Sequence, residues 1–180
     1  GLFVINKDYK TILMNPVAEK LFGISASEVV GKDLREICAV LKGEEELSPD
    51  QRPLAKTLAT GQSSSFDLED NLYLKVRSTG KTFPMALVTS SLKGDGIIGA
   101  VVIFRDITAE KALDEAKSNF ISISSHQLRT PLTSMRWFAE MLMGGDAGPI
   151  TEEQKHFVER IYQATERMIN LVNLLLQLAR

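Results

Sequence analysis

Residues 124–132 have the sequence Ser124-Ser125-His126-Gln127-Leu128-Arg129-Thr130-Pro131-Leu132, which lies inside a long amphipathic helical pattern. His126 and Thr130 are four residues apart, so a helix places both side chains on one face. Neutral imidazole is a good nucleophile near neutral pH because its unperturbed pKa is about 6.5. We therefore expect His126 to be able to take a phosphoryl group, with Thr130 placed to position a water molecule against it.

This stretch resembles the H-box of sensor histidine kinases, in which a His-Glu-Leu-Arg-Thr-Pro-Leu pattern carries the phosphoacceptor histidine. Six of the seven motif positions agree. The resemblance implies that His126 attacks with the imidazole nitrogen farther from the backbone, and that Thr130 orients water when the partner protein is dephosphorylated. The departure is Gln127, which replaces the family's Glu or Asp and cannot accept a proton. Either autophosphorylation is slower here, or the acid is less needed than the family pattern implies.

The other residues of the motif have a plainer interpretation beside the functional one. Arg129 either pairs with phosphate or an acidic partner, or is an ordinary surface arginine. Thr130 can instead bond to its own helix backbone. Pro131 is expected to be structural, kinking the helix and letting it bend between signalling states. His156 is expected to lie in solvent beside the helix seam, and no metal site is expected because the two histidines lack further ligands.

Length and composition set the outer limits. With 180 residues, 44% apolar and 24% charged, the chain can hold one or two small globular domains. The net charge of −2 gives no reason to expect nucleic acid as a partner. Cys38 is the single cysteine, which excludes an intrachain disulfide and fits a reducing, cytoplasmic compartment. No apolar run approaches the roughly 20 residues that span a bilayer, and no signal peptide is visible. Both ends are expected to be boundaries within a longer protein, which leaves a membrane anchor in that parent open.

Residues 1–108 show mainly strand and turn patterns. Short apolar runs predict strands at 2–5, 11–14, 72–77, 83–92 and 97–104. Short helices are predicted between Asn15, a good N-cap, and Gly23, and at 27–30, 34–41 and 54–59. This part of the chain is expected to form the first domain.

This order of elements resembles a PAS domain, and the resemblance is carried by Asn15-Pro16-Val17-Ala18 and by Phe104-Arg105-Asp106-Ile107-Thr108. It implies an antiparallel sheet with short helices that cradles a ligand or partner and passes a signal to the following helix through Asp106 and Thr108. A plain N-cap at that junction is compatible with this role. Residues 1–108 contain no histidine, which excludes a histidine-ligated haem there, and the surroundings of Cys38 do not match flavin-binding members, so no flavin–cysteine adduct is expected.

From residue 107 the pattern becomes helical, which predicts a second domain at 109–180. Apolar residues follow steps of four and three, the spacing of a coiled-coil seam. In the first helix, about 109–143, they are Ala109, Leu113, Ala116, Phe120 and Ile123, then Leu128, Leu132, Met135, Ala139 and Leu142. In the second, about 151–180, they are Phe157, Ile161, Ala164, Met168, Leu171, Leu175 and Leu178. Residues 144–149 break the pattern, and Thr151 with Gln154 predicts a capping box.

Two such helices joined by a short loop form an antiparallel hairpin, and one hairpin cannot bury both seams well. Two hairpins can, as a four-helix bundle, so we expect a parallel homodimer with twofold symmetry. The alternative is a monomeric hairpin packed against the sheet domain.

The resemblances imply the sensor and phosphoacceptor part of a two-component sensor histidine kinase, a phosphotransferase. No glycine-rich phosphate loop or Asn-rich box is present. ATP and Mg²⁺ are therefore expected on a catalytic domain outside this chain. Without that domain, this chain should be inactive and hold no cofactor of its own. His126 would pass its phosphoryl group to an aspartate of a response-regulator receiver domain.

The alternative function is a non-catalytic, ligand-gated dimerisation module with a degenerate H-box. A serine hydrolase using Ser122, Ser124 and Ser125 is weaker, because no acid–histidine relay accompanies them. The PAS ligand, the cognate regulator, phosphorylation in cis or in trans, and the balance of kinase and phosphatase activity stay open.

Overall fold

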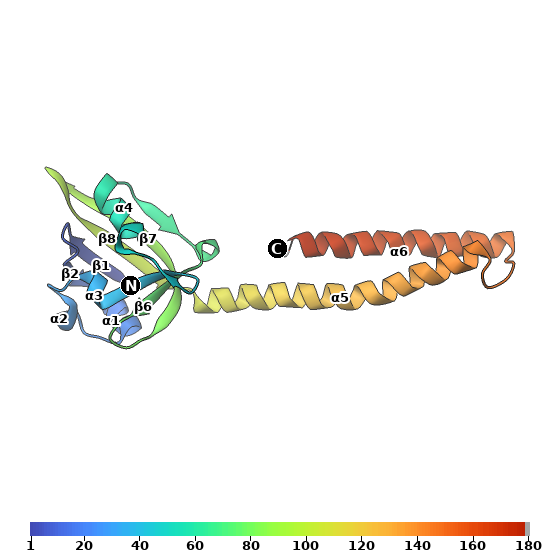
Figure 1. Cartoon of the computed structure of the whole chain (residues 1–180), viewed down its shortest axis with the longest axis horizontal. Coiled ribbons are helices and arrows are strands. Elements are labelled where there is room, and N and C mark those ends of the chain that lie inside the picture. Colours follow the sequence, from blue (N-terminus) through green and yellow to red (C-terminus); the bar gives the residue numbers. More distant parts are fainter. Residues whose placement is uncertain (179–180) are drawn as a thin grey trace. The chain divides into compact units, whose positions relative to one another are not determined.

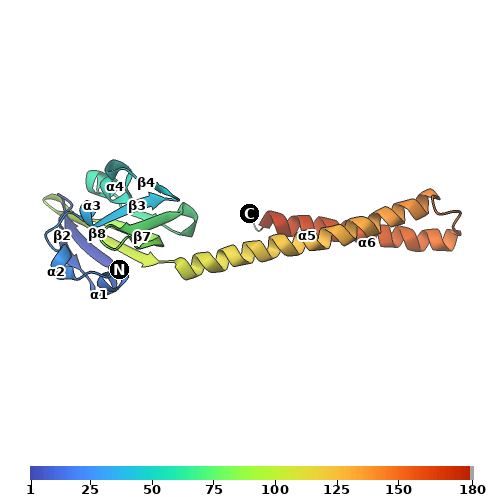
Figure 2. The same cartoon turned by 60° about the horizontal axis from the view of Figure 1, so that its bottom comes forward.

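A computed structural model describes residues 1–178 of the chain (Figures 1 and 2). The chain divides into two compact units, Gly1–Lys111 and the part from Ala112 onward. The first carries a β-sheet with short helices and the second is helical, so the fold is α+β as predicted. Residues 179–180, which the predicted second helix includes, lie outside the described residues.

The first unit is built on an antiparallel sheet. Its strands are β1 (Leu2–Asn6), β2 (Thr11–Met14), β3 (Cys38–Lys42), β4 (Glu45–Glu46), β5 (Ser64–Phe66), β6 (Leu72–Val76), β7 (Thr82–Gly94) and β8 (Gly96–Asp106). The order across the sheet is β2-β1-β8-β7-β6-β3-β4, with β5 beside β7, and neighbouring strands among the described residues run antiparallel. This confirms the antiparallel sheet that the order of elements implies.

Short helices pack against one face of this sheet. They are α1 (Pro16–Phe22), α2 (Ala26–Val29), α3 (Leu34–Ile37) and α4 (Pro53–Thr60), with single 3-10 turns η1 (Pro49–Gln51) and η2 (Leu68–Asp70). α1 begins as predicted, because the Asn15 side chain accepts a hydrogen bond from the Ala18 N–H at 3.0 Å. It ends at Gly23, whose φ of 71° is the left-handed conformation that favours glycine.

The predicted helix at 34–41 is wrong in its second half. α3 ends at Ile37, and residues 38–42 form β3, which pairs with β6 on one side and β4 on the other. Residues 37–41 are apolar throughout, so periodicity cannot distinguish a buried strand from a buried helix. The sheet partners decide the conformation, and these are remote in sequence. The two shortest strands, β4 and β5, were also absent from the predicted elements.

The core of the first unit lies between the sheet and the short helices. At its centre the rings of Phe3, Phe22 and Phe104 have centroids 5.2, 5.5 and 5.6 Å apart. These side chains come from β1, α1 and β8, so they attach the middle of the sheet to the first helix. Each is almost fully buried, which contributes roughly 1.5–3 kcal/mol per side chain by area alone.

The second unit is formed by α5 (Thr108–Gly144) after its first turn and by α6 (Glu152–Leu178), which lie side by side as an antiparallel hairpin (Figures 1 and 2). The predicted capping box begins α6: the Thr151 N–H donates to Gln154 Oε1 at 2.8 Å, and the Gln154 N–H donates to Thr151 Oγ1 at 3.2 Å. Helix and hairpin are therefore as predicted. Of the helices within residues 1–178, none is both long and apolar enough to cross a membrane.

α6 carries two apolar seams, offset from each other by one residue. The first is buried or half-buried in the hairpin and comprises Val158, Tyr162, Thr165, Ile169, Val172 and Leu176. The second is the predicted seam, and most of it is 51–60% exposed: Phe157, Ile161, Met168, Leu171 and Leu175. The side chain of Leu178 lies outside the described part of the helix. One hairpin thus buries one seam and leaves the other in solvent.

α5 changes its apolar face at the H-box. Before the motif, Leu113, Phe120 and Ile123 are 63–72% exposed. Within the motif, Ser125 and Leu132 are buried in the hairpin, and Ala139 is buried beyond it. The predicted stripe therefore does not continue as one face, because the five-residue step between Ile123 and Leu128 rotates it around the helix.

Candidate functional site

His126 lies on the exposed surface of α5, near the middle of the helix. Within residues 1–178, neither of its ring nitrogens has a hydrogen-bond partner, and its backbone carbonyl accepts from the Thr130 hydroxyl at 3.5 Å. An exposed imidazole with free nitrogens has the access that an incoming phosphoryl donor requires. Gln127 beside it is exposed as well.

The structure gives Thr130 the backbone contact expected of its plainer interpretation. Its Oγ1 donates to the His126 carbonyl one turn earlier, at the long limit of a hydrogen bond, and the Thr130 carbonyl accepts from Ser134 Oγ at 3.2 Å. Thr130 remains solvent-exposed on the same turn as His126. A weak bond of this kind leaves the Thr130 hydroxyl available to a water molecule. The role of Thr130 in positioning that water beside His126 stays a prediction.

Arg129 reaches across the hairpin. Its Nη2 donates to Asn173 Oδ1 on α6 at 2.8 Å. The amide takes one of the guanidinium donors without neutralising the charge, so the positive charge three residues after His126 stays available to an anion. Asn173 was not among the predicted site residues, because it lies 44 positions from Arg129 and no local pattern indicates it.

Pro131 lies inside α5, which is assigned as one helix from Thr108 to Gly144 and appears gently curved in Figure 1. Proline has no N–H, so the carbonyl of Gln127 loses its helical donor directly beside His126. The resemblance assigns Pro131 a hinge between signalling states, and that role stays a prediction.

An ion-pair cluster fastens the two helices further along. Arg136 contacts Glu166 on α6 at 3.0 Å and Glu140 on its own helix at 3.7 Å. The hydrogen bond to Glu166 raises the pKa of Arg136 above its ordinary value, so the guanidinium stays charged. Together with Arg129–Asn173, these exposed contacts join α6 to the helix that presents His126.

In the first unit a small cavity of about 50 Å³ lies inside the core. Its wall includes Val40, Leu74 and Met85 from three neighbouring strands, and Cys38 at the start of β3. Burial raises the pKa of the Cys38 thiol to about 12, so that side chain is a neutral wall residue. The cavity is far smaller than the roughly 300–1,000 Å³ of pockets that hold drug-sized ligands.

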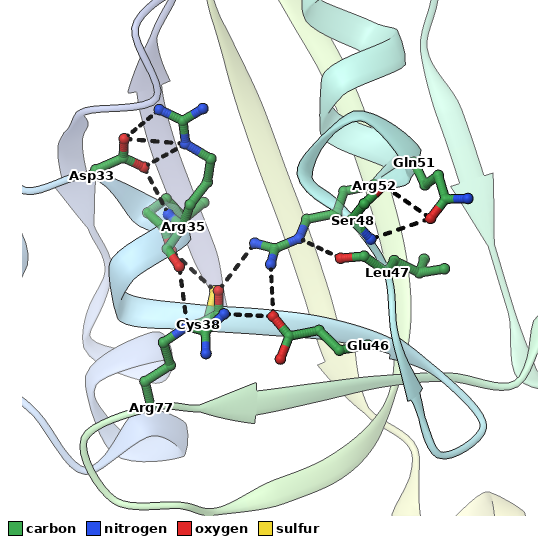
Figure 3. Close-up of polar contacts among 10 residues, drawn as sticks. Asp33, Arg35, Cys38, Glu46, Leu47, Ser48, Gln51, Arg52 and Arg77 are labelled. Carbon is green, nitrogen blue, oxygen red and sulfur yellow. Dashed lines mark hydrogen bonds and ion pairs between the residues drawn. The ribbon is translucent and has the colours of Figure 1, made fainter.

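A buried arginine, Arg52, lies in the wall of this cavity. Figure 3 shows its polar contacts. Arg52 is 8% exposed and donates to the carbonyl oxygens of Leu47 and Cys38, at 3.3 and 3.2 Å. Its charge is balanced by Glu46, 3.2 Å away, which also contacts Arg77 at 2.5 Å. Arg52 was not predicted as a site residue, because no local pattern indicates that an arginine before a helix is buried.

At the junction with α5, Asp106 and Thr108 are in direct contact. Asp106 Oδ1 accepts hydrogen bonds from the Thr108 N–H at 2.9 Å and from its hydroxyl at 2.6 Å. Ile107 between them is buried, and its N–H donates to the Pro84 carbonyl at 3.1 Å. The two residues thus begin the helix as a cap does, and their role in signal coupling stays a prediction.

Comparison with known proteins assigns both units. Residues 1–109 match the PAS domain family, and residues 116–180 match the His Kinase A (phospho-acceptor) domain. The chain therefore belongs to the PAS domain family, and it continues into a phospho-acceptor domain as sensor histidine kinases do. Both resemblances seen in the sequence are confirmed.

Two curated relatives extend over the whole chain. Drug sensory protein A of a Synechocystis species is 32% identical, covering 100% of this chain and 29% of that protein. Sensor protein kinase WalK of Staphylococcus aureus strain Newman is 29% identical, covering 100% of this chain and 27% of that protein. The chain therefore spans less than a third of the length of these relatives. Among solved structures, the PAS domain of nitrogen regulation protein NR(II) from Vibrio parahaemolyticus has a TM-score of 0.45 at 19% identity, over 59% of this chain and 87% of that one.

Proposed function

We propose that His126 is the phosphoacceptor of a two-component sensor histidine kinase and that the PAS unit is its sensor. A nitrogen of the neutral imidazole attacks the γ-phosphorus of ATP held on a separate catalytic domain; the new N–P bond replaces the bond to the β-phosphate oxygen, and ADP leaves. The phosphoryl group then passes to an aspartate carboxylate of a response-regulator receiver domain. The observation that carries this proposal is the exposed His126, with free ring nitrogens, inside the segment that matches a phospho-acceptor domain.

The test is transfer of labelled phosphate from ATP to this chain, catalysed by the ATP-binding domain of its parent kinase. Acid-labile, base-stable label is expected in the unaltered chain and in His156→Ala, which removes the other exposed histidine. His126→Ala should take up no label. Label that persists in His126→Ala, or is lost only in His156→Ala, would refute the assignment. The chain without added catalytic domain is expected to remain unlabelled.

The same proposal includes a homodimer, with two hairpins packed as a four-helix bundle. Its support is the second seam of α6, since apolar side chains at steps of four and three are left 51–60% exposed by the single hairpin. A second copy of the chain can pack against this exposed seam, just as α5 packs against the first seam of α6.

Sedimentation tests the dimer with a matched pair of variants. Leu171→Glu introduces a charge into the exposed seam, whereas Gln163→Glu introduces the same charge on the polar face of α6. At micromolar concentration we expect the unaltered chain and Gln163→Glu to be dimers and Leu171→Glu to be a monomer. A monomeric unaltered chain would contradict the proposal.

Gln127 favours a second candidate, a ligand-gated dimerisation module that no longer accepts phosphate. It occupies the position of the family acid and offers no proton acceptor. An intact dimer that takes up no label, with a catalytic domain shown to bind ATP, would favour this module over the kinase.

A further inference from the structure

Lys111 is anchored to the sheet of the PAS unit on the first turn of α5. Its ammonium donates to Asn71 Oδ1 at 2.6 Å and to the Tyr73 hydroxyl at 2.5 Å, and it lies 4.7 Å from the centroid of the Tyr73 ring. Both hydrogen bonds join the first turn of α5 to β6 and to the residue just before it. We call these three residues the Lys111 clasp.

The acceptors of the clasp are themselves held in place. Asn71 has a φ of 54°, a left-handed conformation that asparagine tolerates, and its carbonyl accepts from the Gly43 N–H at 2.9 Å. Tyr73 lies on β6, opposite Pro84 of β7. The Pro84 carbonyl accepts the Ile107 N–H, so the start of α5 is attached to two neighbouring strands at adjacent positions.

The same two strands form part of the cavity wall. Successive residues of a strand point to opposite faces, so the residues that follow Tyr73 and Pro84 face the core. These are Leu74 and Met85, which are 4% and 0% exposed and line the cavity. A change in the cavity that displaces Leu74 or Met85 therefore also displaces the neighbouring residue that holds α5.

We propose that the Lys111 clasp is the positioning contact through which the cavity wall of the PAS unit controls the start of the helix that carries His126. Lys111 is also the last residue of the first compact unit, so α5 leaves the PAS unit directly after the clasp. Asp106 and Thr108 begin the helix, whereas Lys111 attaches it to β6. The purpose of this contact rests on the proposed function, but its existence can be measured without any phosphorylation.

Amide hydrogen exchange of residues 109–118 in the full chain tests the contact itself. Lys111→Met keeps the aliphatic stem and removes the charge, and Tyr73→Phe removes only the hydroxyl. Each variant should speed exchange in this segment, Lys111→Met by about tenfold. The double variant should exchange little faster than Lys111→Met, because both changes break the same contact between Lys111 and Tyr73. Lys117→Met is the control, since Lys117 is exposed on the same helix. Exchange in Lys111→Met equal to that of the control would overturn the proposal.

Transmission from the cavity is tested at Val40, which lines the cavity on β3 and pairs directly with Leu74. Val40→Leu fills space and Val40→Ala enlarges it, so the assay does not depend on either variant alone. Each is expected to change exchange at residues 109–118 in the unaltered background and to have no further effect in the Lys111→Met background. An effect of equal size in both backgrounds would show another route and overturn the proposal. If the exchange results are as expected but His126 takes up no phosphate, the proposed function is refuted and the proposal for the Lys111 clasp is not.

Discussion

At the scale of single residues, the proposed phosphoacceptor site is best tested at Gln127, which occupies the position of the family acid. It neighbours His126 on the exposed surface of α5, where it can donate and accept hydrogen bonds but cannot take a proton at neutral pH. General acid–base groups contribute about 10²–10⁴-fold to proton-transfer steps. We expect Gln127→Glu to raise the initial rate of His126 phosphorylation by at least about tenfold, measured with added catalytic domain and ATP.

The control for this variant is Gln163→Glu, which makes the same charge change away from the histidine and should leave the rate unaltered. A Gln127→Glu rate equal to that of the unaltered chain would mean that orientation of the imidazole, which glutamine can also provide, is the main role of this position.

A second residue-scale prediction concerns a hydroxyl pair inside the PAS unit. Thr57 on α4 and Thr89 on β7 are both 0% exposed, and their Oγ1 atoms lie 2.7 Å apart. Removing one partner leaves the other buried and unpaired, which costs about 1–3 kcal/mol. Thr57→Val and Thr89→Val should each lower the free energy of unfolding by that amount, measured by urea denaturation.

The double variant Thr57→Val/Thr89→Val removes both polar groups and should be more stable than the sum of the two single changes predicts. Strict additivity would indicate that the hydroxyls do not interact.

The residues that could be predicted from the sequence are those whose partners are close along the chain. Asp106 contacts Thr108 two positions away, and Thr151 contacts Gln154 three positions away. The partners of Arg129 and Lys111 are 44 and 38 positions away, and no local pattern indicates them. His126 was predicted for a different reason, since a family motif surrounds it.

At the scale of elements, the same distinction between local and remote causes separates the correctly predicted helix starts from the helix wrongly predicted beyond Ile37. Helix starts at Asn15 and Thr151 were predicted because a capping side chain bonds within its own turn. Residues 38–41 were predicted as helix although they belong to strand β3, because their conformation is determined by pairing with β6, more than thirty residues later.

The capping box of α6 gives an element-scale prediction. Thr151→Ala removes the acceptor of the Gln154 N–H and leaves that donor without its partner at the start of the helix. We expect a loss of about 1 kcal/mol of stability, seen as faster amide exchange in the first turn of α6 and a lower midpoint of thermal unfolding. Thr133→Ala makes the same chemical change on the exposed surface of α5 and serves as control. Equal exchange in both variants would show that the box does not stabilise the helix start.

At the scale of the whole molecule, the two units differ in how much core each contains. The first unit buries a continuous cluster that includes Phe3, Phe22 and Phe104. In the described part of the second unit, the apolar residues that reach full burial are Leu132, Ala139 and Val172. Since hydrophobic burial is the main stabilising term, the PAS unit can be stable alone, whereas a single hairpin is marginal.

This difference predicts that the thermal stability of the helical unit depends on protein concentration, whereas that of the PAS unit does not. The chain has one probe in each unit: Trp137, its single tryptophan, lies on α5, and Cys38, its single cysteine, lies in the PAS core. With a pKa raised to about 12 by burial, the Cys38 thiol should not react with a thiol reagent at pH 8 until the PAS unit unfolds. If a second copy covers the exposed seam of α6, a hundredfold increase in concentration adds about 2.7 kcal/mol to the stability of each dimer, which is about 1.4 kcal/mol per hairpin. The thermal midpoint of Trp137 fluorescence should then rise by several degrees while the onset of Cys38 labelling stays unchanged. A Trp137 midpoint independent of concentration would contradict assembly through the helices, and a joint shift of both probes would mean that the PAS unit takes part in the dimer.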